Sequence, residues 1–432
     1  MKDLHEIALH SRNSYYDLSV ASLQLRNQAI LCLADLLRDR FPEIRSANLE
    51  DYAAAEADHL SSPLLHRLVF DEKKLEQTVE GLNSLAALPD PLGKTTYAEE
   101  ITGGLSLYRV VCPIGVIGVI FESRPDALIQ IASLCIKSGN SVILKGGREA
   151  IHTNQVLCEC VQNALEMAGL SPESAQLLET REDVSAMLKE DTLIDLIIPR
   201  GSRQFVQYII DNSRIPVLGH SDGICHVYID EYADPALAVK LSLDSKTQNV
   251  SVCNAAETIL IHEKASASLL PGICDALAKA GVEIRGDESV QKIHSCKPAE
   301  ETDWSTEYLD YIVSVKVVSS LQEAVSHINR YGSHHTDCIV TENARNAAEF
   351  MNRVDSAGVY WNASTRFADG FVYGFGAEVG IATGKIHARG PMGLEGLTTY
   401  KYKLIGSGHT LSEMKDGTRS YTHISLHQDC PY

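Results

Sequence analysis

The stretch Ile114-Gly-Val-Ile-Gly-Val-Ile-Phe121 decides the fold. It is a continuous apolar run rich in β-branched side chains, which is typical of a strand buried on both faces of a parallel sheet. Helical periodicity follows over 125–137, and Ser138-Gly-Asn140 supplies a helix stop. A second apolar run covers 141–144. Strand, helix and strand in this close succession predict a βαβ unit.

The alternation of strands and helices continues on both sides of this unit. The first ninety or so residues read as helices, with leucine and isoleucine at helical spacing up to Phe41-Pro42. Downstream, the pattern predicts strands at 105–111, 175–178, 193–198, 224–229, 256–261, 313–318 and 337–340, and helices at 151–168, 183–189, after Gly201 and at 321–330. We therefore expect an α/β protein with two doubly wound domains. The polar tail after Gly406 gives little signal.

Charge and composition exclude several classes of function. The chain has 432 residues, and its 57 acidic side chains against 38 lysines and arginines give a net charge of −19. Such a surface repels phosphate backbones, so nucleic acid is not an expected partner. The N-terminus lacks an apolar signal region, and the most apolar run is too short to span a bilayer, so we expect a cytoplasmic protein with no membrane association.

The eleven cysteines are scattered without zinc-type spacing. They read as reduced thiols, mostly buried, and we predict no metal site. A glycine-rich stretch at 374–380 has the wrong spacing for a dinucleotide-binding loop and no strand before it, so we expect an ordinary loop there.

Three groups of motifs carry a resemblance to a known family. They are Cys112-Pro-Ile-Gly-Val-Ile-Gly-Val-Ile-Phe-Glu-Ser-Arg-Pro125, then Ser251-Val-Cys253-Asn-Ala-Ala-Glu257-Thr, and Gly358-Val-Tyr-Trp-Asn362-Ala-Ser-Thr-Arg366-Phe-Ala-Asp-Gly370. Together they resemble the gamma-glutamyl phosphate reductases of the aldehyde dehydrogenase superfamily, over nearly the whole chain.

The resemblance implies a fold and a reaction. The fold has a cofactor-binding domain (1–224, interrupted by flap strands at about 97–111), a catalytic domain (225–395) and a C-terminal oligomerisation segment and tail (396–432). The reaction reduces L-glutamyl 5-phosphate with NADPH to L-glutamate 5-semialdehyde and phosphate, in proline synthesis from glutamate. The family's flap implies a homo-oligomer, and the instability of the acyl phosphate makes glutamate kinase a candidate partner.

Cys253 matches the family's nucleophile. The chemistry needs a thiolate, because the acyl phosphate is exchanged for a thioester that accepts hydride at carbon. Backbone donors and nearby cations are expected to activate the thiol. The sequence departs from the family just before this motif, where Gln248-Asn-Val250 stands in place of the usual proline-bearing pair.

Two further catalytic residues follow from register with the superfamily. Ser123 occupies the position of the side chain that helps to stabilise the oxyanion, and it reads equally well as a helix N-cap. His220 lies where oxidising members carry a glutamate base that activates water. The absence of that glutamate favours reduction of an activated acyl group over oxidation of an aldehyde.

The resemblance also assigns cofactor contacts. Gly201 and Ser202 match the turn near the nicotinamide, where backbone N–H groups approach a ligand at a helix start. Lys145 matches the lysine that holds the adenosine ribose. Arg148 stands where NAD-preferring members tend to carry glutamate, and a cation there favours the 2′-phosphate of NADP. Glu307 is a candidate for the acid that holds the nicotinamide ribose.

The substrate carries a carboxylate, an ammonium and a phosphate. Arginine suits both anions by bidentate bonding, and Arg124 and Arg366 are the leading candidates, with Arg389 behind them. Asn362, Ser364 and Thr365 offer amide and hydroxyl donors, and Glu122 is an acid for the ammonium. Structural ion pairing is an equally acceptable reading of each arginine.

Two other classes of function stay open. A coenzyme A-acylating or other aldehyde dehydrogenase uses the same thioester chemistry. A non-catalytic partner of glutamate kinase is a different class, against which the intact Cys253 motif argues.

Overall fold

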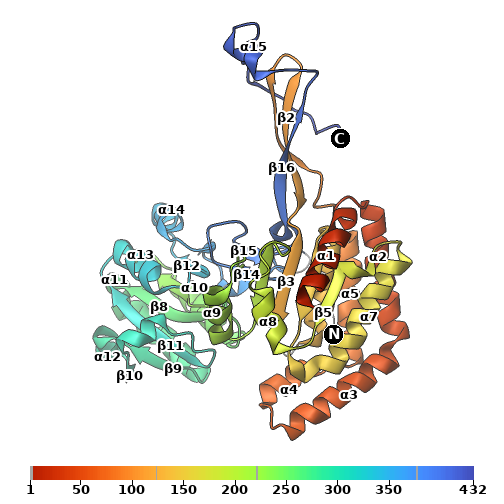
Figure 1. Ribbon diagram of the computed structural model, residues 1–432. Helices are drawn as coiled ribbons and strands as arrows, with labels where there is room; N and C mark the ends of the chain where they lie inside the picture. Colours follow the sequence, from red (N-terminus) through yellow and green to blue (C-terminus); the bar gives the residue numbers. More distant parts are fainter. Residues whose placement is uncertain (1–2, 123, 220–221, 376–377) are drawn as a thin grey trace. The chain divides into compact units, whose positions relative to one another are not determined.

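The computed structural model describes residues 3–122, 124–219, 222–375 and 378–432 (Figure 1). It contains two compact units. The first comprises Met1–Leu218, Gly376–Gly380 and Met392–Tyr432, and the second comprises Gly219–Phe375 and Ile381–Pro391. Each contains parallel β-structure with helices, which confirms the predicted α/β class.

The first unit begins with helices, as the periodicity predicts. They are α1 (Leu4–Leu18), α2 (Leu23–Asp39), α3 (Phe41–Ala57), α4 (Ser62–Leu68) and α5 (Glu72–Ala87). The expected break at Phe41-Pro42 separates α2 from α3, because Pro42 lies in the first turn of α3, where a missing N–H costs no hydrogen bond.

A four-stranded parallel sheet follows, in the order β5-β4-β3-β6. Its strands are β3 (Val116–Phe121), β4 (Ser141–Lys145), β5 (Ala175–Leu178) and β6 (Leu196–Arg200), and the connecting helices are α6 (Pro125–Lys137), α7 (Ile151–Met167), α8 (Arg181–Met187) and α9 (Arg203–Asn212). Every residue of β3 is buried, as the decisive apolar run predicts. The chain order reverses between β3 and β6, so the carboxyl ends of these two strands form the topological switch point, where α/β sheets bind ligands.

Two boundaries in this sheet differ from the prediction. Helix α8 begins two residues earlier than expected, because Thr180 and Asp183 form a capping box that starts it at Arg181. Strand β6 begins at Leu196 and not at Leu193, since Leu193 lies in the turn after α8.

The second unit contains a seven-stranded sheet in the order β10-β9-β11-β8-β7-β12-β13. The strands are β7 (Cys225–Ile229), β8 (Ala256–His262), β9 (Glu283–Gly286), β10 (Lys297–Pro298), β11 (Ile312–Val318), β12 (Thr336–Val340) and β13 (Gly358–Trp361). Helices α10 (Pro235–Thr247), α11 (Glu263–Lys279), α12 (Glu288–Ile293), α13 (Leu321–Tyr331) and α14 (Ala344–Arg353) accompany it. Two apolar clusters bury these central strands, one built with α10 and α11 and the other with α13 and α14.

A separate four-stranded antiparallel sheet belongs to the first unit (Figure 1). Its order is β16 (Thr398–Ile405), β2 (Leu105–Pro113), β1 (Thr95–Thr102) and β17 (Ile424–Ser425). The polar tail, which carries little pattern in the sequence, contains the short α15 (Leu411–Lys415) and returns to pair β17 with β1. A small apolar cluster of Ala98, Tyr108 and Val110 packs against the tail residues Leu426 and Cys430.

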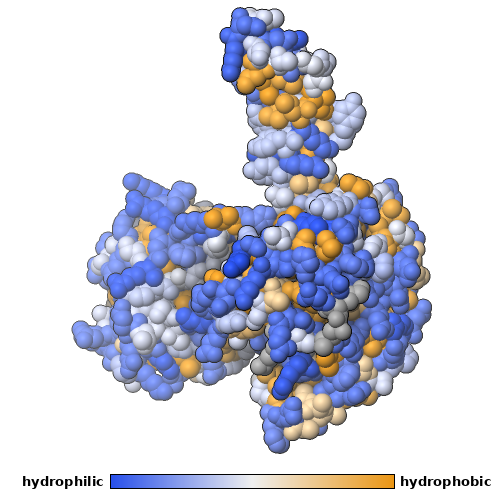
Figure 2. Space-filling view, viewed as in Figure 1, coloured by the Kyte–Doolittle hydropathy of each residue, from blue (hydrophilic) through white to orange (hydrophobic). Residues whose placement is uncertain are grey.

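Apolar side chains are also exposed on this sheet. Tyr97, Tyr400, Tyr402 and Leu404 are all more than a third exposed, and Figure 2 shows apolar residues gathered among polar ones there. A further two-stranded sheet joins β14 (Gly380–Ala382) to β15 (Gly390–Met392). The loop expected at 374–380 thus ends as β14 begins. Among the described residues no helix has the length and apolar character needed to cross a bilayer.

Candidate active site

Cys253 lies in the nucleophile turn, by which we mean residues 248–255 between α10 and β8. Its side chain is partly buried. Six other cysteines are fully buried, and burial raises the pKa of each of their thiols; they are Cys135, Cys158, Cys160, Cys225, Cys274 and Cys338. A thiol of raised pKa in an apolar interior is a poor nucleophile. Cys253 differs from these six in being only partly buried, so a substrate can reach its thiol.

Residues 223–225 pack against the backbone of Cys253. A Cβ placed on Gly223 would lie 2.1 Å from the carbonyl oxygen of Cys253 and 2.3 Å from its Cα, so the site accepts only glycine without rearrangement. The Cys225 thiol donates to that same carbonyl at 3.3 Å. Gly223 in turn donates its N–H to Oε1 of Glu307 at 3.0 Å. Glu307, which the sequence predicts as a cofactor residue, therefore binds the backbone of the glycine that packs against Cys253.

A second segment, residues 362–370, is fastened to the nucleophile turn. The Thr365 hydroxyl donates to the carbonyl of Asn254 at 2.7 Å, and Asn254 Nδ2 donates to the carbonyl of Ala368 at 2.9 Å. Arg366 lies between these two bonds and donates from Nε to Oε1 of Gln248 at 2.8 Å. Burial lowers the pKa of Arg366, and the nearby Cys253 opposes this change. The guanidinium thus lies within electrostatic reach of the thiol.

The three polar residues expected to serve the substrate make contacts within the scaffold. Asn362 has a positive φ of 54° and pairs with the backbone of Thr341, accepting its N–H and donating to its carbonyl, both at 3.0 Å. Ser364 is buried and lies 3.2 Å from the Ser245 hydroxyl. Thr365 is fully buried. These bonds favour a structural role for the three side chains, and their substrate contacts stay predictions.

The predicted cofactor turn lies at the switch point of the first unit. Glu122 follows β3, and its Oε2 accepts the N–H of Ser202, the residue before α9, at 3.0 Å. A Cβ on Gly201 would meet that carboxylate oxygen at 2.6 Å and the ring of Phe205 at 2.8 Å. Glu122, which the sequence offered for the substrate ammonium, is thus a ligand of the turn itself.

The two predicted cofactor cations differ in exposure. Lys145 ends β4 and is 7% exposed, whereas Arg148, in the 3-10 helix Arg148–Ala150, is 77% exposed. Arg148 Nη2 lies 3.9 Å from a carboxylate oxygen of Asp58, whose side chain is 75% exposed. So exposed a pair holds its partners weakly, which leaves the guanidinium able to bind another anion.

These features fit a nicotinamide dinucleotide. A switch point, a glycine turn crowded by the side chains of Glu122 and Phe205, and a ten-residue helix that starts after it are the elements that bind a pyrophosphate or ring in doubly wound sheets. The lysine at the end of β4 lies on the strand next to β3, at the same edge of the sheet.

Arg124 is exposed directly before α6. It lies close enough to Arg67 to lower that residue's pKa, an effect second to burial, while Glu122 opposes both. Arg67 was missed by the sequence reasoning, because it lies in a short helix far from every quoted motif. Two further predicted residues, Ser123 and His220, fall outside the described residues.

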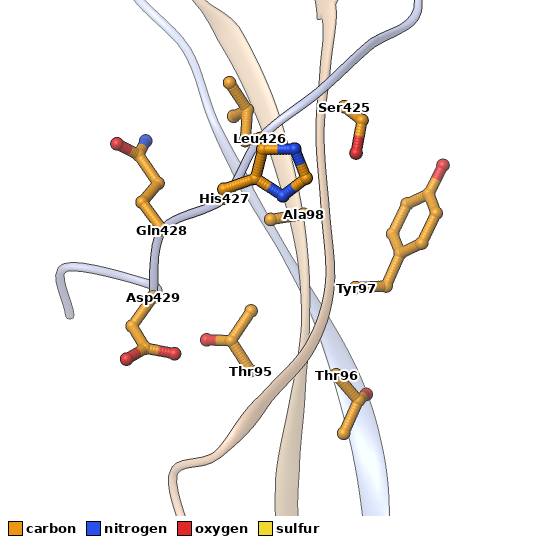
Figure 3. A pocket seen from close by; sticks show the side chains of 9 residues that line it. All are labelled: Thr95, Thr96, Tyr97, Ala98, Ser425, Leu426, His427, Gln428 and Asp429. Carbon is orange, nitrogen blue, oxygen red and sulfur yellow. The ribbon is translucent and has the colours of Figure 1, made fainter.

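A groove lies on the antiparallel sheet of the first unit. Figure 3 shows it between residues 95–98 of β1 and residues 425–429 of the tail. None of the predicted site residues lines it. The part of the chain that the structure describes also contains no group of three histidine, cysteine or carboxylate residues arranged to hold a metal ion.

Comparison with known proteins places this geometry in a family. The model of the aldehyde dehydrogenase family matches residues 34–292. The gamma-glutamyl phosphate reductase of Acetivibrio thermocellus is 54% identical over 428 residues, which cover 99% of both chains. That of Pelotomaculum thermopropionicum is 53% identical and covers 99% of this chain and 98% of the relative.

Solved structures agree with these relatives. The crystal structure of gamma-glutamyl phosphate reductase from Thermotoga maritima superposes with a TM-score of 0.93 at 39% identity, covering 95% of this chain and all of that one. An acetylating aldehyde dehydrogenase from Geobacillus thermoglucosidasius, 16% identical, covers 94% of this chain and 97% of that one with a TM-score of 0.63, and so shares the fold.

Proposed function

The chain belongs to the gamma-glutamyl phosphate reductase family of aldehyde dehydrogenase-like oxidoreductases, and we propose that it reduces L-glutamyl 5-phosphate with NADPH to L-glutamate 5-semialdehyde and phosphate. This is the second step of proline synthesis from glutamate. The observation that carries the proposal is the fastening of the Arg366 segment to the nucleophile turn, which keeps a guanidinium within electrostatic reach of Cys253.

Arg366 has two tasks in this mechanism. Its positive charge favours the thiolate form of Cys253, which is the nucleophile. Its planar donor groups also match a phosphate or carboxylate of the substrate. Attack by the sulfur on the acyl carbon forms a carbon–sulfur bond, and the carbon–oxygen bond to phosphate breaks. The products of this step are a thioester on Cys253 and inorganic phosphate.

The remaining chemistry needs a reductant, and a bound nicotinamide supplies the hydride. The turn at Gly201 and Ser202 and the buried Lys145 are the groups that hold this cofactor in our proposal, with Arg148 on the 2′-phosphate of NADPH. Glu122 now accepts the Ser202 N–H, so any ligand group that takes this donor must displace the carboxylate.

The carboxylates near the nucleophile accept hydrogen bonds from the protein itself, which favours reduction of the thioester over its hydrolysis. Glu307 accepts the N–H of Gly223, and Glu257 accepts from Lys246 and from the backbone of Leu309. These bonds occupy carboxylate oxygens that would otherwise be available to take a proton from water. A thioester beside such groups is protected from hydrolysis, which would waste the activated acyl group.

The test is the reverse reaction with purified protein. L-glutamate 5-semialdehyde is supplied with NADP⁺ or NAD⁺, with inorganic phosphate, with coenzyme A, or with neither acceptor. We expect turnover that requires phosphate, prefers NADP⁺ and is lost in Cys253→Ala. Turnover with coenzyme A in place of phosphate would assign the chain to the acylating aldehyde dehydrogenases, and activity retained by Cys253→Ala would overturn the nucleophile.

Three proposals about the protein's setting accompany this reaction. We propose a cofactor-binding domain over 1–224 and a catalytic domain over 225–395, with the sheet of β16, β2, β1 and β17 serving self-association into a homo-oligomer. Replacing its exposed Tyr400, Tyr402 and Leu404 by serine should lower the mass measured by light scattering.

We also propose that the enzyme works in the cytoplasm and receives its unstable substrate from glutamate kinase.

A further inference from the structure

A buried ion pair lies at the two ends of the nucleophile turn. Lys246, in the last turn of α10, donates from Nζ to Oε2 of Glu257, the second residue of β8, at 2.6 Å. Both side chains are 0% exposed. Residues 248–255, including Cys253, lie between these two anchors. The pair therefore closes the loop that carries the nucleophile.

The same pair reaches the support behind Cys253. Oε1 of Glu257 accepts the N–H of Leu309 at 3.3 Å. Two residues earlier in that loop is Glu307, which accepts the N–H of Gly223. Lys246 and Glu257 are thereby connected, through one short loop, to the glycine that backs the nucleophile.

The end of α10 also holds the Arg366 segment. Ser245, the neighbour of Lys246, lies 3.2 Å from the Ser364 hydroxyl and accepts the N–H of Thr365 at 3.3 Å. A displacement of this helix end therefore moves the thiol and the guanidinium relative to each other. An ion pair that holds the end of α10 in place therefore also holds the Cys253 thiol and the Arg366 guanidinium in place.

Stability alone does not account for the pair. Burial raises the pKa of Glu257 to about 7 and lowers the pKa of Lys246, so the interior disfavours both charged forms. Well-packed apolar side chains commonly replace such a pair without loss of stability. What an ion pair adds is direction, because its bonds specify one geometry where apolar packing allows several.

We propose that Lys246 and Glu257 are positioning residues for Cys253. Their ion pair holds the nucleophile turn in its position relative to Gly223 and Arg366. The inference rests on the proposed function, since it takes Cys253 as the nucleophile. It predicts that the pair governs kcat and thiol reactivity more than substrate affinity, because the thiol lies on the turn that the pair closes, whereas the proposed substrate ligand Arg366 lies on the separate segment 362–370.

The test compares three variants in the full-length protein. Lys246→Met with Glu257→Met replaces the pair by apolar side chains of similar volume. Glu257→Gln keeps an acceptor for Leu309 but removes the charge. Lys264→Met with Glu231→Met is the matched control, because this 2.9 Å pair lies in the same unit, is partly exposed and does not bound the nucleophile turn. For each we measure kcat, KM, the thermal midpoint, and the rate of alkylation of Cys253 by iodoacetamide across pH, followed at the Cys253 peptide by mass spectrometry.

We expect the double methionine variant to remain folded, with kcat and the alkylation rate each reduced about tenfold or more and KM changed less than threefold. Glu257→Gln should show a smaller reduction of both rates, and the control none. If the methionine variant folds and keeps both rates, the proposal is wrong. If it does not fold, Glu257→Gln decides by the same two rates. Cys253→Ala separates this outcome from failure of the proposed function, since activity retained there removes the nucleophile itself.

Discussion

Each of the two units contains a glycine turn in which a glutamate carboxylate accepts a backbone N–H. Next to Gly201, the N–H of Ser202 is bound by Glu122, and the N–H of Gly223 is bound by Glu307, each at 3.0 Å. What surrounds the two glycines differs. A Cβ on Gly223 would meet backbone atoms of Cys253, whereas a Cβ on Gly201 would meet the ends of the Glu122 and Phe205 side chains.

The difference matches the tasks that we propose for the two turns. Backbone packed on backbone leaves no freedom, so the nucleophile turn keeps one position. Side-chain ends can rotate away, so the cofactor turn can adapt as a ligand arrives and leaves. In our proposal the Glu307 carboxylate is therefore a fixed support for the nucleophile turn, whereas the Glu122 carboxylate gives way when the cofactor binds.

The largest effect is expected from Gly223→Ala. The new methyl group must displace Cys253, and a shift of about 1 Å in a reacting group lowers rates about a hundredfold. We expect kcat to fall by that factor or more, measured in the phosphate-dependent assay. The counterpart Gly201→Ala should change kcat less than tenfold and act mainly on the cofactor's KM. Equal losses of kcat in the two variants would remove the distinction between the turns.

The next effect concerns the cation at the nucleophile turn. Arg366→Met removes a charged hydrogen-bonding partner, a loss of about 1.5–3 kcal/mol, which corresponds to roughly ten- to a hundredfold in kcat/KM for the acyl phosphate. Arg366→Lys restores the charge but not the planar donor pair, so it should recover only part of the loss. A lysine variant with full activity would show that a point charge suffices.

The sequence could predict features that a local pattern records, and it could not predict contacts between residues that are far apart in the chain. The βαβ unit was predictable because the apolar run at 114–121 records a strand buried on both faces. Cys253 could be proposed as the nucleophile because its neighbours form a long motif that resembles the family's, and this role stays a prediction. The contact between Gly223 and Glu307 joins residues 84 positions apart, and no local pattern records such a pairing.

Residues whose role depends on burial were the hardest to find. Lys246 looks like a surface lysine in a helix, since its hydrophobic surroundings come from β8 and the loop at Tyr308, over which its ammonium lies 5.9 Å from the ring centre. The tail is similar, because β17 becomes a strand only by pairing with β1. Arg366 was predicted from a polar motif, but its electrostatic reach to Cys253 depends on the bond between Thr365 and Asn254, which lie on two segments far apart in the sequence.

A smaller effect is expected at the exposed edge of the first unit. Arg148→Glu places a negative charge where we propose the 2′-phosphate of NADPH, so KM for NADPH should rise about tenfold while KM for NADH changes less than twofold. Steady-state kinetics with both cofactors measures this. The expected effect is below that at Arg366, because the exposed Arg148 is screened by solvent and already has Asp58 as a neighbour. Equal loss with both cofactors would contradict the assignment.

The smallest effect on activity is expected from Asn362→Ala, although the residue lies in the most specific motif of the chain. Its amide binds the Thr341 backbone twice, and its φ of 54° is one that asparagine tolerates better than alanine. Losing both bonds should lower the free energy of unfolding by about 2 kcal/mol, measured by urea denaturation, with kcat and KM of the folded enzyme changed less than twofold. A rise of tenfold in the KM for the acyl phosphate would instead make Asn362 a substrate ligand. The motif would then mark the site directly, whereas the observed bonds indicate that it marks the scaffold that holds Arg366.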